Sequence, residues 1–361
     1  MRIIQVTPRY YPTLGGVEAV VQRISEMLVE RGNEVVVYSV DKHKNLMPIE
    51  NVNGVIVKRF SALYADPLYL PETSFSSSLR RENADIIHVH NIHTFPPLIA
   101  ALFKTRNQSL VLQPHYHRYG QTALRHSLFK LYQRVFHGLL FSKSNAVIAN
   151  SRYEEQILRE DFPALKRMVL IPEGVDTSEA ESVMHVPVLP KRILFVGSLH
   201  RYKNVHRLLE GFAYLIKIRK VNCRLVIVGN GPERESLINL ASSLGIAKLV
   251  DWKQGLSRAD LLNEYAKASV FVMLSPLESF SRVVFDALII GVSTVVLNYG
   301  ALCHLVNEGL AEGVDSLNND SVANALLKAS ECTYQKLSLT SGSFLDWDSY
   351  LDRLTSLYRK L

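Results

Sequence analysis

Cysteine is scarce in this chain, and long apolar runs are missing. Cys223, Cys303 and Cys332 are the three cysteines in 361 residues. They are far apart and odd in number, which excludes a disulfide framework and a zinc knuckle. No stretch approaches the roughly 18–20 apolar residues of a membrane span, and the start of the chain lacks the apolar core of a signal peptide. We therefore expect a reducing, cytoplasmic setting.

Acidic residues are absent from one long stretch of the first half. Residues 86–153 contain eight Lys or Arg and seven His, but no Asp or Glu, in a chain whose net charge is +7. The overall composition, 47% hydrophobic and 21% charged, is that of a folded globular protein. The basic stretch contains no recognised nucleic-acid-binding motif, so nucleic acid is not an expected partner.

Two segments of the sequence follow the same plan. The apolar strand RIIQVT at 2–7 precedes a glycine-containing loop and an amphipathic helix from about Glu18 to Glu30; RILFVG at 192–197 precedes the loop GSLHRYKN and a helix from about Val205 to Arg219. Strands that are continuous apolar runs and alternate with helices are typical of buried parallel sheets. We predict an α/β fold of two facing, Rossmann-like, doubly wound domains whose strand-end loops surround one cleft.

The expected boundaries follow from this plan. Residues 1–180 form the N-terminal domain, and 181–191, with two prolines and no periodicity, form a linker. Residues 192–343 form the C-terminal domain, and 344–361 form a last amphipathic helix. The sequence Asp346-Trp347-Asp348 at the start of this helix resembles a metal-binding pair of acids. Because acids at a helix N-terminus stabilise the helix dipole, we do not expect a metal site there.

Several loops that follow strands carry candidate phosphate-binding residues. Gly15 and Gly16 precede a helix, where paired glycines let the backbone approach a phosphate; an ordinary loop is the alternative. In the second half, His200, Arg201 and Lys203 could clamp a diphosphate. Cations at a helix N-terminus oppose the helix dipole unless an anion offsets them, which favours the functional interpretation.

A third loop introduces two carboxylates. Glu278 is expected in the loop SPLESFS, and Asp286 in the helix that follows. Because Asp286 lies among Val, Phe, Leu and Ile, it needs a partner for its charge. The alternative is a dipole-stabilising Glu and a solvated Asp. His115 and His117 end another strand, where a purely structural role is the alternative.

In this order, the motifs resemble those of a retaining family 4 glycosyltransferase of the GT-B fold. The resemblance runs nearly end to end, through YYPTLGGVEAVV, PHYH, NSRY, IPEGVD and the turn GNGP. Its most specific part is ESFSRVVFDALIIG, similar to the family's two carboxylates separated by seven residues. It implies a hexosyltransferase-type enzyme with an acceptor-binding N-terminal domain, a nucleotide-sugar-binding C-terminal domain, and a last helix that crosses back to the N-terminal domain.

The resemblance also implies residue roles. Gly16 would approach the donor diphosphate, with Gly15 beside it, and Lys203 would neutralise the leaving group. Glu278 would contact the donor sugar, with the backbone amides of Ser279, Phe280 and Ser281 nearby; Asp286 would hold the ribose, and His115 would touch the sugar. The implied catalytic residues are thus His115, Lys203 and Glu278. No metal or cofactor is expected, because lysine and helix ends supply the positive charge.

Some positions depart from the family pattern. Ser198 stands where an arginine clamp is usual, and Arg201 is a hypothetical substitute. Asp286 is one methylene shorter than the usual Glu, Ser281 replaces a usual Gly, and Ser293 a usual Pro. These departures leave open a two-lobed sugar-binding or assembly protein that no longer catalyses. A nucleotide-sugar epimerase, which can use the same fold and similar phosphate loops, is a second alternative.

The basic stretch suggests the acceptor. Arg118, Arg125, Lys130 and Arg134 surround an apolar segment that resembles a membrane-facing amphipathic helix. We therefore hypothesise a glycan or lipid-linked acceptor and peripheral binding to an anionic surface at the inner face of the membrane. The alternative is that these apolar residues are helix core, with cations snorkelling around it.

Overall fold

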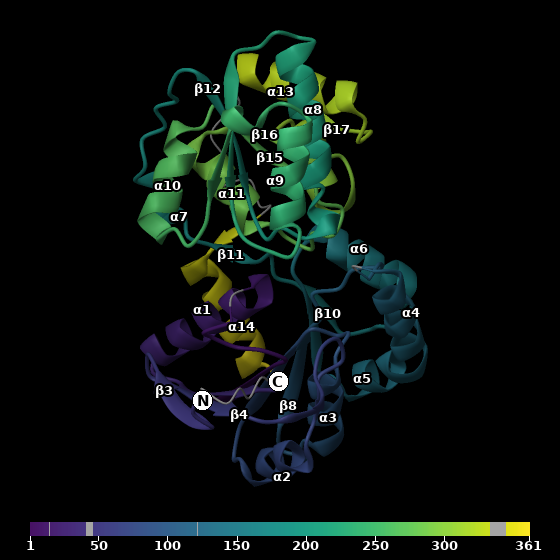
Figure 1. The fold of residues 1–361 in the computed structure, drawn as a ribbon. Helices are drawn as coiled ribbons and strands as arrows, with labels where there is room; N and C mark the ends of the chain where they lie inside the picture. The colour runs from purple at the N-terminus through teal and green to yellow at the C-terminus, as the bar shows by residue number, and fades with distance from the viewer. Residues whose placement is uncertain (14, 41–45, 121, 333–343) are drawn as a thin grey trace. The chain divides into compact units, whose positions relative to one another are not determined.

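The computed structural model describes residues 1–13, 15–40, 46–120, 122–332 and 344–361. The chain divides into two compact units (Figure 1). Unit 1 comprises Met1–Pro172 and Asp348–Leu361, and unit 2 comprises Glu173–Trp347. The expected domain end at residue 343 and Leu14 of the glycine motif lie outside the described residues.

Unit 1 is built on an eight-stranded sheet in the order β10-β9-β8-β7-β1-β2-β4-β3. Every pairing is parallel except β3 with β4. The strands are β1 (Arg2–Thr7), β2 (Glu34–Ser39), β3 (Ile49–Val52), β4 (Val55–Arg59), β7 (Ile86–His90), β8 (Ser109–Gln113), β9 (Ala146–Ala149) and β10 (Met168–Leu170). A separate antiparallel pair joins β5 (Ala62–Tyr64) and β6 (Leu70–Pro71).

Helices accompany this sheet between successive strands. They are α1 (Gly16–Glu30), α2 (Thr73–Arg81), α3 (Phe95–Phe103), α4 (Ala123–Tyr132), the π-helical turn η1 (Gln133–His137), α5 (Gly138–Lys143) and α6 (Arg152–Asp161). Helix α1 ends as the sequence predicted, because Gly32 adopts a positive φ of 78° that terminates the helix. The core of the unit is formed by the apolar strand residues, among them Ile4, Val36 and Val89.

The last helix, α14 (Trp347–Arg359), packs into unit 1 from Asp348 onward. Tyr350, Leu351 and Leu354 are fully buried. Arg31, just beyond α1, forms ion pairs with Asp348 and Asp352 at 2.9 and 2.6 Å. The C-terminal helix is therefore a structural part of unit 1.

Unit 2 contains a six-stranded parallel sheet in the order β14-β13-β12-β15-β16-β17. Its strands are β12 (Lys191–Val196), β13 (Cys223–Val228), β14 (Val250–Lys253), β15 (Val270–Met273), β16 (Ser293–Leu297) and β17 (Glu312–Val314). Its helices are α7 (Thr177–Glu181), the 3₁₀ turn η2 (Arg201–Lys203), α8 (Val205–Lys217), α9 (Arg234–Ser243), η3 (Ala247–Leu249), α10 (Arg258–Lys267), α11 (Arg282–Ile290), η4 (Gly300–Leu302), α12 (Cys303–Asn307) and α13 (Asn319–Glu331).

The division between the units falls after Pro172 rather than after residue 180. Strand β11 (Gly174–Val175) pairs with β18 (Leu345–Asp346), and both β11 and α7 contact α11. These contacts attach residues 173–181 to unit 2. The expected linker therefore lies inside unit 2, where no helix or strand occurs between the end of α7 at Glu181 and the start of β12 at Lys191.

Candidate active site

Two loops of unit 2 bring Lys203 and Glu278 together. Strands β12 and β15 are hydrogen-bonded neighbours, so the loops that follow them lie at the same edge of the sheet. Lys203, at the end of η2, donates from Nζ to Oε1 of Glu278. Burial opposes the charged form of Lys203, but the adjacent Glu278 carboxylate raises the lysine pKa overall. The site therefore holds a permanent ammonium group whose side chain is only 13% exposed.

The beginning of α11 presents unpaired backbone amides beside this ion pair. In the described part of the chain, the backbone amides of Ser279, Phe280 and Ser281 donate no hydrogen bond. Ser281 is the N-cap residue of α11, but its hydroxyl does not cap the helix, and this buried Oγ has no partner within the described residues. Unpaired amides at a positive helix end form an environment suited to an anion.

Glycines let the loops after β12 and β13 pack backbone to backbone. A Cβ on Gly229 would lie 1.9 Å from the carbonyl oxygen of Gly197, and one on Gly231 would lie 2.6 Å from that of Leu199. The amide of Leu199 donates to the carbonyl of Asn230 at 2.9 Å. This contact fixes the loop that leads into Lys203 and explains why the GNGP turn needs both glycines.

Asp286 has a partner that the sequence did not reveal. Arg258, the first residue of α10, donates from Nη1 and Nη2 to the two carboxylate oxygens of Asp286 at 2.6 and 2.8 Å. Its Nε also donates to Glu179 of α7 at 3.2 Å. This bidentate pair raises the pKa of Arg258 and satisfies the buried carboxylate. Asp286 is thus buried and not solvated. A ribose bound by Asp286 would have to share its carboxylate oxygens with Arg258.

The proposed substitute for the missing arginine clamp is only loosely held. Ser198 and His200 are exposed, and His200 stacks on Tyr202 with ring centroids 5.7 Å apart. Arg201 is 69% exposed in its side chain, and its nearest acid is Glu233 at 3.8 Å. Arg201 is therefore accessible to a ligand but is not held in place by a close ion pair.

In unit 1, His115 lies in a buried chain of polar side chains at the carboxyl ends of the strands. Its Nδ1 is 3.0 Å from Nδ2 of Asn150, and its Nε2 is 3.3 Å from Nδ1 of His90. His90 Nε2 is in turn 2.8 Å from Oε1 of Gln5 on β1. Because Asn150 Nδ2 and His90 Nε2 donate, all three links run in one direction, and His115 carries its proton on Nε2.

The same chain continues to α14. Asn150 accepts from Gln113 Nε2 at 2.6 Å, and Gln113 accepts from the Tyr350 hydroxyl at 3.3 Å. A second tyrosine, Tyr358, contacts Nδ1 of His88 at 2.7 Å. Burial, followed by the effect of His117, lowers the pKa of His115 to about 3, so His115 is neutral near physiological pH.

The backbone around His115 is also constrained. His115 adopts a left-handed φ of 48°, an uncommon conformation for a non-glycine residue. The buried carboxylate of Glu154 accepts from the amides of Tyr116 and Asn150 at 2.5 and 2.7 Å. Glu154 therefore joins the loop after β8 to the loop after β9, and these contacts stabilise the strained residue.

The glycine loop of unit 1 leads into an uncapped helix. Gly15 is the extended N-cap of α1 and makes no side-chain cap. A Cβ on Gly15 would lie 2.1 Å from Oε2 of Glu18, whereas a Cβ on Gly16 would meet nothing within 4 Å. Glu18 is held by Arg9, whose Nε donates to it at 2.7 Å. A side chain at Gly15 would therefore displace the Glu18 carboxylate that Arg9 holds, whereas Gly16 faces open space.

The four cations expected to form an acceptor patch differ in their surroundings. Arg118 is paired with Glu160 and Asp161 at 2.5 and 2.8 Å, and Arg125 is paired with Asp66. Lys130 and Arg134 are exposed and have no acidic partner among the described residues. Within the described residues, Lys130 and Arg134 are thus the members of the expected patch whose charge no acidic side chain offsets.

Exposed apolar side chains accompany Lys130 and Arg134. Leu124, Leu131, Val135 and Leu139 are 73%, 62%, 56% and 40% exposed. Tyr132 and Leu140 of the same segment are buried in unit 1. The segment α4–η1–α5 therefore has one face in the core and one face of exposed leucine, valine and cations.

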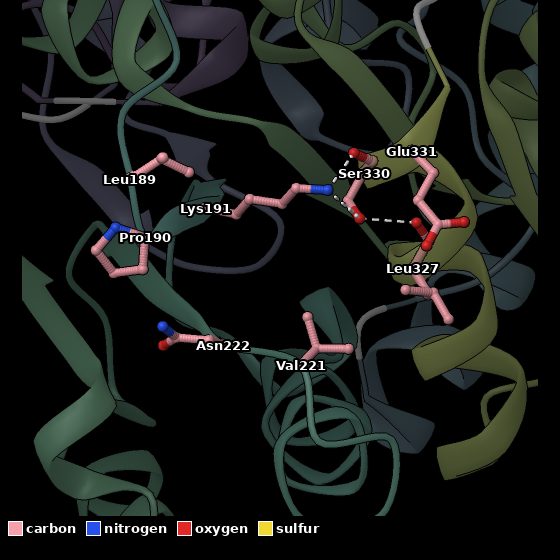
Figure 2. Close-up of a pocket in the computed structure, with 8 residues that line it drawn as sticks. All are labelled: Leu189, Pro190, Lys191, Val221, Asn222, Leu327, Ser330 and Glu331. Atoms are coloured by element: carbon pink, nitrogen blue, oxygen red, sulfur yellow. Dashed lines mark hydrogen bonds between the residues drawn. The ribbon is translucent and has the colours of Figure 1, made fainter.

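A cavity of about 520 Å³ lies elsewhere in unit 2. Figure 2 shows Lys191 reaching across it to Ser330, to whose carbonyl Nζ donates at 2.7 Å. Lys191 begins β12, so the cavity is at the amino end of that strand, away from Lys203. In the described ranges, no group of three or more His, Cys, Asp or Glu is arranged to hold a metal, and no helix there has the length and apolar character needed to span a bilayer.

Sequence reasoning missed most of the polar chain in unit 1. The sequence does contain one sign of this chain, which is the presence of polar residues inside otherwise apolar strands. They are Gln5 in β1, His88 and His90 in β7, and Gln113 in β8. Residues two apart in a strand share a face, and the rings of His88 and His90 lie 4.2 Å apart. Arg258 carried no such signal.

Two family models match consecutive parts of the chain. The model described as Glycosyltransferase Family 4 matches residues 14–179, and the model described as Glycosyl transferases group 1 matches residues 181–339. Together they span most of the sequence. The chain belongs to the family 4 glycosyltransferases.

Curated relatives of this glycosyltransferase have several named activities. N-acetyl-alpha-D-glucosaminyl L-malate synthase of Bacillus anthracis is 24% identical, over 89% of this chain and 87% of the relative. D-inositol 3-phosphate glycosyltransferase of Corynebacterium urealyticum is 27% identical, over 63% of this chain and 60% of the relative. An uncharacterized glycosyltransferase of Methanocaldococcus jannaschii is 23% identical over 99% of this chain and 98% of the relative.

Solved structures show the fold of the glycosyltransferase. Sucrose-phosphate synthase from Thermosynechococcus elongatus matches with a TM-score of 0.77 at 18% identity, covering 99% of this chain and 98% of that one. An Anabaena protein solved with UDP and glucose matches with a TM-score of 0.73 at 17% identity, covering 99% of both chains. These likenesses confirm the predicted GT-B fold class.

Proposed function

We propose that this glycosyltransferase moves a hexosyl group, with retention of configuration and without a metal, from a nucleotide-sugar to a hydroxyl of a glycan or lipid-linked acceptor. The observation that carries the proposal is the Lys203–Glu278 pair beside the unpaired amides of Ser279–Ser281. A fixed ammonium and a positive helix end match the charge of a diphosphate. The solved Anabaena relative binds UDP and glucose, which supports a nucleotide-sugar donor.

The ion pair supports a specific division of roles. An incoming diphosphate is a stronger anion than one carboxylate, so it competes with Glu278 for Lys203. Glu278 is then free to accept hydrogen bonds from the hydroxyls of the donor sugar. As the bond from the anomeric carbon to the phosphate oxygen breaks, Lys203 and the amides stabilise the growing negative charge. The acceptor oxygen forms the new bond on the same face, and its proton leaves with a phosphate oxygen.

His115 is suited to the sugar rather than to the diphosphate. Its ring is neutral because burial lowers its pKa to about 3. Both ring nitrogens already have partners, Asn150 and His90. We therefore assign His115 to positioning the donor sugar and to stabilising positive charge at the reacting carbon, and not to proton transfer.

Donor identity and metal requirement can be tested together. Thermal-shift measurements with UDP-, GDP- and ADP-sugars should find one nucleotide that stabilises the protein, because a bound donor favours the folded state by mass action. Mass spectrometry of the products should then show transfer to an acceptor that persists in EDTA. Loss of transfer in EDTA, restored by a divalent metal, would remove the metal-independent mechanism.

The same product analysis separates the two alternatives. An epimerase would isomerise the donor sugar without any acceptor. A non-catalytic sugar-binding protein would be stabilised by a nucleotide-sugar but would neither hydrolyse nor transfer it. The bidentate Arg258–Asp286 pair is the observation that favours the non-catalytic alternative. Both oxygens of Asp286, the residue that would hold the ribose, already accept hydrogen bonds from Arg258.

We further propose that unit 1 binds an anionic membrane surface through α4–η1–α5. Leu131 and Val135 are exposed next to Lys130 and Arg134, a combination that favours adsorption at a charged bilayer surface. Flotation with anionic liposomes at low salt should carry the wild-type protein but not the Leu131→Asp/Val135→Asp variant. Equal flotation with anionic and neutral liposomes, or none at all, would refute this membrane role.

A further inference from the structure

Unit 1 contains a cavity that is formed by none of the candidate site residues. It has a volume of about 410 Å³ and lies between α5, β9 and the loop 162–167. Phe141, Val147, Phe162 and Leu165 line it, and the rings of Phe141 and Phe162 meet edge to face with centroids 4.8 Å apart. The walls are therefore apolar and partly aromatic.

The two serine hydroxyls of the cavity lining already have hydrogen-bond acceptors. Ser142 Oγ donates to the carbonyl of Leu139 at 2.7 Å, and Ser144 Oγ donates to that of Leu140 at 2.9 Å. Both hydroxyls are thus satisfied within their own helix. A ligand of this cavity needs an apolar body and gains little from hydrogen-bonding groups inside it.

The rim of the cavity is cationic. Lys166 and Arg167 line it and are exposed, and Lys143 is next to the lining residues Ser142 and Ser144. Within the described ranges, none of these three cations has an acidic partner within ion-pair distance. Burial, and then the charge of Lys143, lowers the pKa of nearby Lys104, which indicates uncompensated positive charge in this part of unit 1.

The position of the cavity separates it from the reaction. Ser144 precedes β9, and Lys166 and Arg167 precede β10, so the cavity lies at the amino ends of these strands. His115 lies beyond the carboxyl end of β8, at the opposite edge of the same sheet. An occupant of the cavity therefore lies at the opposite edge of the sheet from His115.

We propose that this cavity binds an acyl chain of an anionic membrane lipid, whose phosphate rests on Lys166 and Arg167. The proposal rests on the membrane role given above, because α5 contributes both Phe141 to the cavity and Leu139 to the exposed apolar face. A lipid held in this way anchors unit 1 while the carboxyl-end loops remain open for substrates. An apolar cavity with a basic rim matches an anionic lipid better than a neutral one.

The test uses soluble single-chain lipids below their micellar concentration, measured by calorimetry on the full-length protein. Lauroyl lysophosphatidylglycerol should bind at one site, and lauroyl lysophosphatidylcholine about tenfold more weakly. Inorganic phosphate alone should not bind measurably. Equal affinity for the two lysolipids, or binding of phosphate alone, would overturn the proposal.

Three variants locate the site. Ala164 is exposed and lines the cavity, so Ala164→Trp fills the cavity from a position that tolerates size, and it should abolish lysolipid binding. Lys166→Glu/Arg167→Glu should remove the preference for the anionic lipid. Arg152→Glu, an exposed charge reversal at the start of α6 and so at the opposite end of β9, is the matched control and should bind as the wild type does. Wild-type lysolipid binding by Ala164→Trp would place the ligand elsewhere and refute the assignment.

The cavity and the membrane face are tested separately. Leu131→Asp/Val135→Asp should lose liposome flotation but keep lysolipid binding, whereas Ala164→Trp should lose lysolipid binding. If the wild-type protein floats with liposomes but binds no lysolipid, the cavity proposal fails and the membrane role remains. If it binds lysolipid but does not float, the membrane role fails and the cavity holds a free anionic amphiphile instead of a bilayer lipid.

Discussion

Nδ1 of His115 lies 3.0 Å from Nδ2 of Asn150, a nitrogen that can only donate. Asn150 cannot present its oxygen instead, because that oxygen accepts from Gln113 at 2.6 Å. The contact therefore sets the tautomer of His115, with its proton on Nε2. The orientation of a ring at the candidate active site is thus determined by a chain of amides that begins at Tyr350 of α14.

Asn150→Asp should disturb this tautomer. A carboxylate in place of the amide accepts a proton from Nδ1 and raises the pKa of His115. We expect turnover to fall about tenfold to a hundredfold, because a charged or wrongly oriented ring no longer suits the sugar. Histidine nitrogen NMR, together with turnover, checks the prediction. If turnover falls while the tautomer of His115 stays unchanged, the loss of activity does not arise from His115, and the prediction is wrong.

Unit 1 should be unusually sensitive to acid. Burial lowers the pKa of five of its histidines: to about 3 for His88 and His115, to about 4 for His137, and well below 6.5 for His90 and His93. The unfolded chain then binds more protons than the folded one, so the stability present above pH 6.5 is lost as the pH falls. Below pH 6.5, each such histidine lowers the free energy of unfolding by about 1.4 kcal/mol for each pH unit. Five histidines together therefore lower it by roughly 7 kcal/mol over one pH unit.

That cost is comparable with the whole stability of a typical domain. Hydrogen exchange should therefore show unit 1 opening at a higher pH than unit 2 during acidification. His137→Phe keeps an aromatic ring beside Phe141 and Phe162 and should move the acid midpoint of unit 1 downward. Simultaneous opening of both units, with no shift in the variant, would contradict the prediction.

Glu173 should give unit 2 a pH dependence of opposite sign. Burial raises its pKa from 4.5 to about 7, against the smaller effect of Arg282, whose Nε is 3.9 Å away. The stabilisation from the neutral acid is complete below 4.5 and is lost as the pH rises through about 7, a change of roughly 3 kcal/mol. Relative to the wild type, Glu173→Gln should gain thermal stability at about pH 8 but not at about pH 5. A difference that does not vary with pH would argue against a titrating Glu173.

The Arg258–Asp286 pair allows stability and donor binding to be separated. Arg258→Met leaves a buried carboxylate alone and should cost about 1–3 kcal/mol of stability, reduced because Arg258 is 34% exposed. Arg258→Met/Asp286→Leu should regain most of that stability. If Asp286 also holds the ribose, the double variant should still bind the nucleotide-sugar more weakly than the wild type. Full donor affinity in the stable double variant would make Asp286 purely structural.

The sequence predicted the first strand and helix of each unit, because the strands of a buried parallel sheet are continuous apolar runs. It predicted the loops that carry Lys203 and Glu278 for the same reason, since both follow such strands. It could not predict what the buried polar groups contact. Arg258 reaches Asp286 from a neighbouring helix, and the partners of Gln113 and His88 come from α14 at the far end of the chain. These pairings depend on packing between helices and strands, which no local pattern encodes.

The most direct test of the account is the turnover of sugar transfer in Lys203→Ala and Glu278→Ala, with folding checked by thermal denaturation. Each variant should lose at least about tenfold in turnover, because each removes a group that acts on the donor in the transition state. Donor-stabilised folding should weaken most in Lys203→Ala, which loses the ammonium partner of the diphosphate. Turnover close to the wild type in both folded variants would show that the reaction does not take place at this pair.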